Sequence, residues 1–210
     1  MTDQELPLVT LTTDFGHKDP FVGIMKGVIL GICPQARIVD LVHEVASQDI
    51  GRASRILADA YRFFPEGTVH VAVVDPGVGT RRRALAMKAG GHGFVGPDNG
   101  IFTDVIRSQE EEPSIHALVN PRYFLPRVSR TFHGRDVFAP VAAWLAAGTR
   151  IEEFGPPLSD PTLLEHEGPR LVPGERVIGR IMGFDRFGNA VWIKERACVE
   201  KEIVVENHSL

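Results

Sequence analysis

The chain has 210 residues, of which 43% are hydrophobic and 24% charged, which is ordinary for a globular protein with a substantial core. Its formal net charge of -4 provides no basic field for binding nucleic acid or an anionic membrane. The two cysteines, Cys33 and Cys198, lie far apart, which excludes a disulfide framework and a Cys-based metal motif.

The first 150 residues alternate between strand-like runs of β-branched residues and segments with apolar residues at helical spacing. Pro34 ends the first predicted helix, and Asp49 is the candidate N-cap of the second. This alternation predicts an α/β fold with a mainly parallel sheet flanked by helices. In chain order we predict a strand over 8–16, a helix over 20–34, a strand over 36–44, a helix over 49–65, strands over 67–75, 83–90 and 92–100, and a helix over 136–148.

The character of the sequence changes after Gly148. We predict an α/β N-terminal domain over 1–150 with the candidate site residues, a linker rich in Pro and Gly over 151–172, and a short, apparently truncated β-rich segment over 173–210. This segment has too few strands to bury a core alone, so we expect it to dock on the first domain or a neighbouring chain. Because no secretory signal pattern or bilayer-length apolar run is present, we expect a cytoplasmic protein.

Acidic residues directly follow the apolar runs of three of the predicted strands. They are Asp14, Asp75 and Asp98, the last with Asn99, and a glycine follows each within two residues. Ligands of open α/β sheets bind outside the carboxyl ends of the strands. A single Asp-Gly pair is an ordinary turn signal, but three at one sheet edge predict a shared polar pocket.

The stretch VAVVDPGVGTRRRALAM, residues 71–87, has three interpretations. A phosphate-binding loop needs a Lys-Ser/Thr pair and a following helix, neither of which is present, and Asp75 repels phosphate. The three arginines alternatively form a solvated face. If the chain is extended from Arg81 onward, strand alternation turns Arg82 away from the solvent-facing Arg81 and Arg83 and towards Asp75. The last two interpretations remain open on this argument.

One further candidate is His133, in a Phe-His-Gly turn before the last predicted helix. A lone histidine is more often a packing residue than a catalyst. Its position at a loop-to-helix junction favours a role in the site.

Six motifs in a fixed order carry a resemblance to a known family. They are LTTDFGHKDPFVGIMKGVI, IVDLVHEVASQDI, FFPEGTVHVAVVDPGVGT, GPDNGIFT, TFHGRDVFAPVAA and FDRFGNAVW, and together they extend to Trp192. The chain resembles the S-adenosyl-L-methionine (SAM) hydroxide adenosyltransferases, or SAM hydrolases, which are related to SAM-dependent fluorinases and chlorinases. The resemblance implies hydrolysis of SAM to adenosine and L-methionine by attack of activated water or hydroxide on the ribose 5′ carbon, without a metal or another cofactor.

The resemblance also implies the catalytic residues. The hydrolytic branch is marked by the Asp of DPGVGT, the Arg seven positions later and the His of FHGRD, which here are Asp75, Arg82 and His133. The halogenases carry a different residue at the aspartate position, and a carboxylate there repels a halide. Which of Asp75 and His133 accepts the proton of water remains open.

Five further residues are implied as substrate-binding. By the resemblance, Asp14 binds the ribose hydroxyls, Asp19 and Asp185 bind the amino end of methionine, and Asn189 faces the adenine. Phe21 stands where many relatives have tyrosine. The resemblance further implies a homotrimer with its sites between subunits, with SAM or adenosine as the bound small molecule.

Two alternatives accompany the hydrolase hypothesis. One is a non-catalytic adenosine- or SAM-binding protein with an incomplete C-terminal domain, because the chain shows no counterpart of the family's later Asn-Ser-containing stretch. The other is a metal-dependent hydrolase, which no H-x-x-x-H or comparable ligand spacing supports. Its ligands would come from Asp14, Asp40, His43, Asp75 and Asp98.

Overall fold

A computed structural model describes residues 6–165, 170–172, 176–178, 181–184, 187–188 and 190–192. The chain forms two compact units, Met1–Leu164 and Glu165–Leu210. In the second unit, four short strands pair as antiparallel β7 with β8 and β9 with β10. Their bounds are Arg170–Val172, Arg176–Ile178, Ile181–Phe184 and Ala190–Trp192. Within the described part of the chain, no helix has the length and apolar character needed to cross a bilayer.

The first unit is built on a six-stranded sheet with the order β2-β1-β3-β5-β4-β6. Only β4 runs against the other strands of this sheet, because it pairs antiparallel with both β5 and β6. The predicted mainly parallel α/β fold is therefore confirmed. The strands are β1 (Leu8–Thr13), β2 (Arg37–Val42), β3 (Val69–Val73), β4 (Ala84–Ala89), β5 (His92–Pro97) and β6 (Ser114–Ala117).

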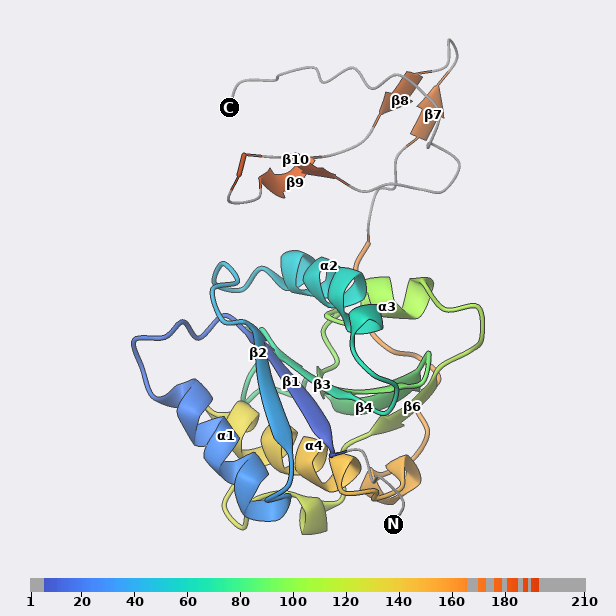
Figure 1. Cartoon of the computed structure of the whole chain (residues 1–210). Coiled ribbons are helices and arrows are strands. Elements are labelled where there is room, and N and C mark those ends of the chain that lie inside the picture. Colours follow the sequence, from blue (N-terminus) through green and yellow to red (C-terminus); the bar gives the residue numbers. More distant parts are fainter. Residues whose placement is uncertain are drawn as a thin grey trace. The chain divides into compact units, whose positions relative to one another are not determined.

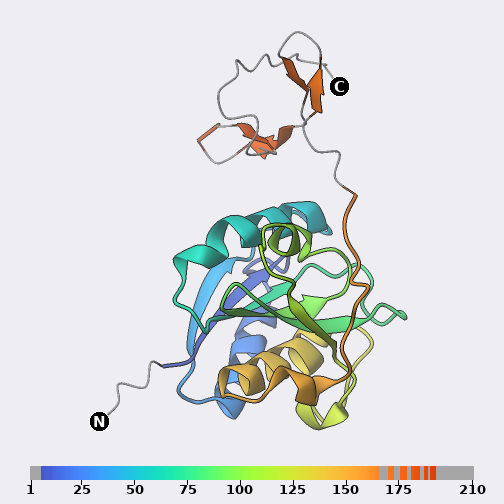
Figure 2. The same cartoon turned by 90° about the vertical axis from the view of Figure 1, so that its right-hand side faces the viewer.

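Helices cover both faces of this sheet, with α1 and α4 on one face and α2 and α3 on the other (Figures 1 and 2). One apolar cluster joins Leu11 of β1 to Ile29 of α1 and Val141 of α4. A second cluster on the opposite face includes Leu57 of α2 and Val105 of α3. The helices are α1 (Phe21–Ile32), α2 (Ile50–Ala60), α3 (Thr103–Arg107) and α4 (Ala139–Ala146), with a π-helical turn at Gly134–Phe138 and 3₁₀ turns at Tyr61–Phe63, Pro121–Tyr123 and Ile151–Phe154.

The local signals of the sequence explain several of these elements. Every residue of β3 is buried, as expected for a central strand covered on both faces. Asp49 caps α2, since its side chain accepts a hydrogen bond from the backbone nitrogen of Arg52 at 2.9 Å. The predicted strands over 83–90 and 92–100 form an antiparallel pair joined by a turn at Gly90 and Gly91. The short elements β6 and α3 were not predicted.

A buried pair of histidines, His70 and His92, makes the stability of the protein depend on pH. His70 is fully buried, with Nδ1 2.8 Å from Thr10 Oγ1 and Nε2 3.2 Å from His92 Nδ1. Burial, together with the neighbouring His92, lowers the pKa of His70 from 6.5 to about 3. Between these two pH values the unfolded chain therefore binds a proton that the folded chain does not. The contribution of neutral His70 to the free energy of unfolding is present above pH 6.5 and declines as pH falls towards 3.

We expect His70→Phe to flatten this decline, because its ring takes the place of an imidazole stacked on Phe94 and cannot be protonated. The slope of the unfolding free energy against pH differs between the variant and the unmodified chain by up to about 1.4 kcal/mol per pH unit, the value for one proton. Urea unfolding at several pH values measures it, and His17→Ala, at an exposed histidine, is the control. An unchanged slope in His70→Phe contradicts the prediction.

Candidate active site

A pocket of 310 Å³ opens at the edge of the sheet where the parallel strands end. It is bordered by the loops that follow β1, β2 and β3 and by the loop that precedes the π-helical turn. A larger hollow of 610 Å³ lies at the opposite edge, around Gly90 and Gly91, and contains none of the candidate catalytic residues. The smaller pocket is lined by Asp14, Phe15, Ser47, Gln48, Val73, Asp75, Pro76, Val78, Thr131, Phe132, His133 and Gly134.

Asp75, Arg82 and His133 lie together at this pocket. Arg82 Nε donates a hydrogen bond to Asp75 Oδ1 at 2.9 Å, and Arg82 Nη2 bonds both Asp75 Oδ2 and His133 Nδ1, the latter at 2.9 Å. The side chains of Arg82 and Asp75 are only 9% and 5% exposed. A bidentate ion pair of this kind fixes the direction of the carboxylate, so Asp75 is held rigidly at the wall of the pocket.

The loop between Asp75 and Arg82 brings the ion pair close to the segment that carries His133. Gly79 has φ +74°, and a Cβ atom there would lie 2.2 Å from the carbonyl oxygen of Arg130. Only glycine combines that backbone conformation with such a close approach. Arg82 is further held by a hydrogen bond to the carbonyl of Arg83 at 3.0 Å and by the ring of Phe138, 5.3 Å from its guanidinium carbon.

The π-helical turn at Gly134–Phe138 follows His133 directly. Its Asp136 is fully buried and accepts a hydrogen bond from the backbone nitrogen of Ser129 at 2.8 Å, so the turn anchors the loop that precedes His133. π-helical turns occur frequently at functional sites. No feature of the sequence distinguished this turn from the ordinary helix that we predicted over 136–148.

The imidazole of His133 is held in its neutral form. A guanidinium only donates hydrogen bonds, so His133 Nδ1 accepts the bond from Arg82, and the proton of the neutral ring lies on Nε2. Burial and then the positive charge of Arg82 lower the pKa of His133, against smaller opposing effects of Asp75, Asp136 and the backbone of Ser129. The lone pair of Nδ1 is therefore already engaged.

Asp14 reaches the same pocket from the end of β1. Its Oδ2 accepts a hydrogen bond from the backbone nitrogen of Gln48 at 3.0 Å. Gln48 also lines the pocket and has φ 66°, a left-handed conformation that is rare outside glycine and costly for other residues. Sequence reasoning missed Gln48, because nothing in the sequence marks a positive φ at a glutamine.

The other predicted substrate-binding residues have different positions. Phe21 is 41% exposed, and its ring packs edge-on against Phe15 and Phe132, with centroids 5.9 and 5.2 Å away. Phe15 and Phe132 line the pocket, so Phe21 belongs to a cluster of three aromatic rings beside the pocket. Asp19 is exposed in the loop before α1 and does not line the pocket. Asp185 and Asn189 lie outside the described residues.

Two expectations about this edge of the sheet were wrong. Asp98 does not share the pocket with Asp14 and Asp75, since its carboxylate binds Arg83 Nε at 2.6 Å and the backbone nitrogen of Thr162 at 2.7 Å. The side chain of Arg83 is 39% exposed, in line with its expected place on a solvent face, but it also bridges Asp98 and Asp160. The strand begins only at Ala84, so the alternation that we assumed from Arg81 onward does not apply to the arginines.

The metal-hydrolase alternative finds no support in the geometry. Among the described residues, no group of three or more His, Cys, Asp or Glu side chains is arranged to hold a metal ion. Asp40 and His43 bind each other, and their remaining bonds go to Lys26 and Thr13.

The fold and the pocket define an α/β protein with a candidate small-molecule site at the carboxyl edge of its sheet. Residues 9–155 match the family of the SAM hydroxide adenosyltransferase N-terminal domain, and the chain belongs to this family.

Three relatives illustrate this membership. An (R)-S-adenosyl-L-methionine hydrolase of Salinispora arenicola is 41% identical over 87% of this chain and 70% of its own. A fluorinase of Nocardia brasiliensis is 29% identical over 91% of this chain and 72% of its own. The crystal structure of an uncharacterized conserved protein from Thermotoga maritima has a TM-score of 0.83 and 41% identity, and the match covers 88% of this chain and 70% of that one.

Proposed function

We propose that this protein hydrolyses SAM to adenosine and L-methionine. The observation that carries the proposal is the partly buried Asp75–Arg82–His133 trio at the pocket, with both carboxylate oxygens of Asp75 held by Arg82. Relatives about 40% identical to the chain are named (R)-S-adenosyl-L-methionine hydrolases, which supports the same activity here.

The reaction asks little of the protein beyond position and proton transfer. The oxygen of water forms a bond to the ribose 5′ carbon while the bond from that carbon to the sulfonium sulfur breaks, and its electron pair returns to sulfur. Methionine leaves as a neutral thioether that needs no proton. Holding the water in line with the breaking bond removes the entropic part of the barrier.

We propose Asp75 as the group that accepts the proton of the attacking water. An ionised carboxylate has about four lone-pair sites, and Arg82 uses only two of those on Asp75. His133 is less suited, because its Nδ1 lone pair already accepts from Arg82. Water becomes strongly acidic as its bond to carbon forms, so a weakly basic carboxylate is sufficient.

Substrate recognition follows the family pattern in this proposal. Asp14, whose carboxylate lies in the pocket, binds the ribose hydroxyls, and Phe21 adds aromatic surface at the rim. Asp19 and Asp185 bind the amino end of methionine, and Asn189 faces adenine.

The assembly and the compartment are further proposals. We propose a homotrimer in which the N-terminal α/β domain of one subunit and the C-terminal segment of another complete each site. Sedimentation velocity distinguishes a trimer from a monomer. The two widely separated cysteines favour a cytoplasmic location.

The decisive experiment is incubation with SAM in water enriched in oxygen-18. We expect equimolar adenosine and methionine by chromatography, with the heavy oxygen in the 5′ hydroxyl of adenosine. Heavy oxygen elsewhere contradicts attack at the 5′ carbon. Tight adenosine binding by calorimetry without any turnover supports the alternative of a non-catalytic adenosine- or SAM-binding protein.

A further inference from the structure

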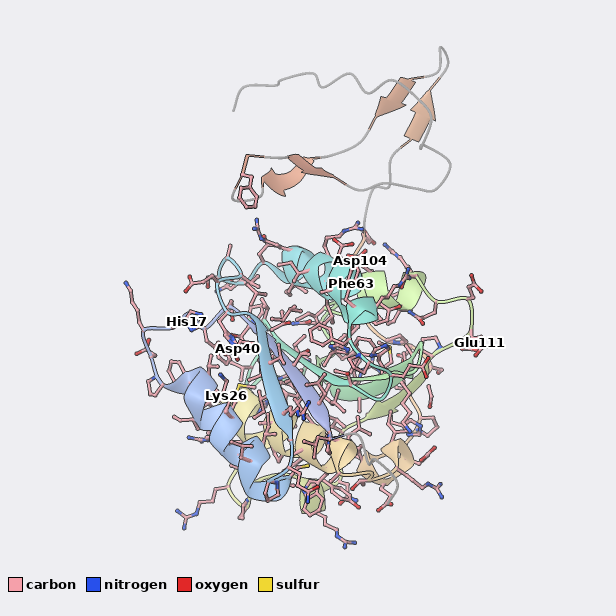
Figure 3. All side chains as sticks on the ribbon, in the orientation of Figure 1. His17, Lys26, Asp40, Phe63, Asp104 and Glu111 are labelled. Carbon is pink, nitrogen blue, oxygen red and sulfur yellow. The ribbon has the colours of Figure 1, made fainter. Side chains whose placement is uncertain are left out.

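A second hydrogen-bonded network lies next to the pocket without lining it. Thr13 Oγ1 is 2.8 Å from His43 Nδ1, His43 Nε2 is 2.9 Å from Asp40 Oδ1, and Asp40 Oδ2 accepts from Lys26 Nζ at 2.6 Å. His43 is 2% exposed. Figure 3 shows Asp40 on β2 and Lys26 on α1, and Thr13 ends β1, so the network joins these three elements. The proposed mechanism uses none of its members.

The network has one consistent arrangement of protons when His43 is neutral. A carboxylate only accepts, so His43 Nε2 carries the proton and donates it to Asp40. His43 Nδ1 then accepts from the Thr13 hydroxyl, which leaves Thr13 Oγ1 free to accept from the backbone nitrogen of Phe15 at 3.2 Å. Hydrogen bonds linked in this way polarise and strengthen one another.

The same residues fasten the loop that carries Asp14. Asp14 lies between Thr13 and Phe15, and the backbone nitrogen of Gly16 donates to the carbonyl of His43 at 2.8 Å. The loop is thus tied to His43 on both sides of Asp14, through the Thr13 side chain and through Gly16. The conformation of residues 13–16 therefore depends directly on the place of His43.

From these contacts we infer that His43, oriented by Asp40, is a positioning residue that sets the direction of the Asp14 carboxylate in the pocket. The inference rests on the proposed function, in which Asp14 binds the ribose hydroxyls. Ribose contacts of this kind hold the substrate and the transition state alike, so disturbing them raises KM and leaves kcat nearly unchanged. A merely structural role predicts lost stability without this split.

The same strand provides a matched control. Thr10 Oγ1 lies 2.8 Å from His70 Nδ1, as Thr13 Oγ1 does from His43 Nδ1, and Thr10 and Thr13 are both fully buried. His70 bonds onward to His92, at the opposite edge of the sheet. Thr10→Val and Thr13→Val therefore each remove a hydrogen bond to a buried histidine, one away from Asp14 and one beside it, and Thr13→Val also removes the acceptor of the Phe15 backbone nitrogen.

The test compares SAM turnover and adenosine binding in the unmodified chain and in these two variants. We expect Thr13→Val to raise KM for SAM and Kd for adenosine at least about fivefold, because about fivefold is the worth of one hydrogen bond and Thr13 Oγ1 takes part in two, with kcat within about twofold. Thr10→Val is expected to lose stability and to keep both constants. Equal KM values in the two variants overturn the inference and leave the proposed function intact, whereas an unmodified chain that cleaves no SAM contradicts the proposed function itself.

A second pair keeps the test decisive if Thr13→Val does not fold. The side chain of Asp40 is 39% exposed, so Asp40→Ala removes the partner of His43 with little change in the core. Lys26→Ala is its control, because it removes the ammonium and preserves the bond between His43 and Asp40. We expect a higher KM for Asp40→Ala than for Lys26→Ala, and equal values contradict the inference.

Discussion

Replacing Asp75 with asparagine is expected to lower kcat for SAM hydrolysis by about 100- to 10,000-fold, the contribution of a positioned general base. Asparagine has nearly the shape of aspartate, and its carbonyl oxygen still accepts one hydrogen bond from Arg82. Its amide cannot take the proton of water, however. His133 cannot replace it without losing the bond in which its Nδ1 accepts from Arg82.

The matched control for this variant is Asp98→Asn. Asp98 is also a buried aspartate at this edge of the sheet, and it is also paired with an arginine, Arg83. Because its carboxylate binds Arg83 and Thr162 and does not line the pocket, we expect lower stability with kcat preserved. Steady-state kinetics and thermal unfolding of both variants measure the contrast. If Asp75→Asn keeps its turnover, Asp75 is not the base.

Much of the fold was predictable because its signals are local. Apolar runs with turn residues gave the strands, and Asp49 marked the start of α2. The elements that were missed, β6 and α3, have only four and five residues and are too short for a periodic pattern. The order of the strands follows from pairings between distant segments.

The site was harder to predict from the sequence than the fold, and Arg82 illustrates the reason. Strand alternation favoured its contact with Asp75 as one of two open interpretations, yet the strand begins at Ala84 and Arg83 also binds a carboxylate. The pairing instead depends on the path of the glycine loop, which brings Arg82 back over Asp75 and against His133. The conclusion was correct, but the mechanism that we assumed was wrong.

The place of Gln48 in the pocket wall could not be predicted from the sequence for a related reason. Gln48 combines a positive φ with a hydrogen bond from its backbone nitrogen to Asp14, which lies in a loop that follows a different strand. Strain of this kind is stored where the surrounding structure dictates it. Sequence patterns reveal the elements of the fold and the residue types at their ends, but not how neighbouring loops constrain one another.

Removing Arg82 is expected to affect both stability and activity. Arg82→Met deletes the partner of a buried carboxylate, and breaking such a pair from one side costs about 3–5 kcal/mol of unfolding free energy. Asp75 and His133 also lose the group that orients both, and loose placement of catalytic groups lowers kcat by about 100-fold or more. Urea unfolding and SAM turnover test the two effects separately.

Two further variants, Arg82→Lys and Arg81→Met, separate the role of the charge of Arg82 from the role of its geometry. Arg82→Lys restores the charge but offers a single ammonium in place of a planar fork, so it cannot reproduce the paired bonds to Asp75 together with the bond to His133. We expect it to recover most of the stability and little of the activity. Arg81 is exposed, so Arg81→Met should change neither. Full turnover in Arg82→Lys would mean that the positive charge alone suffices and that the geometry of the guanidinium is not required.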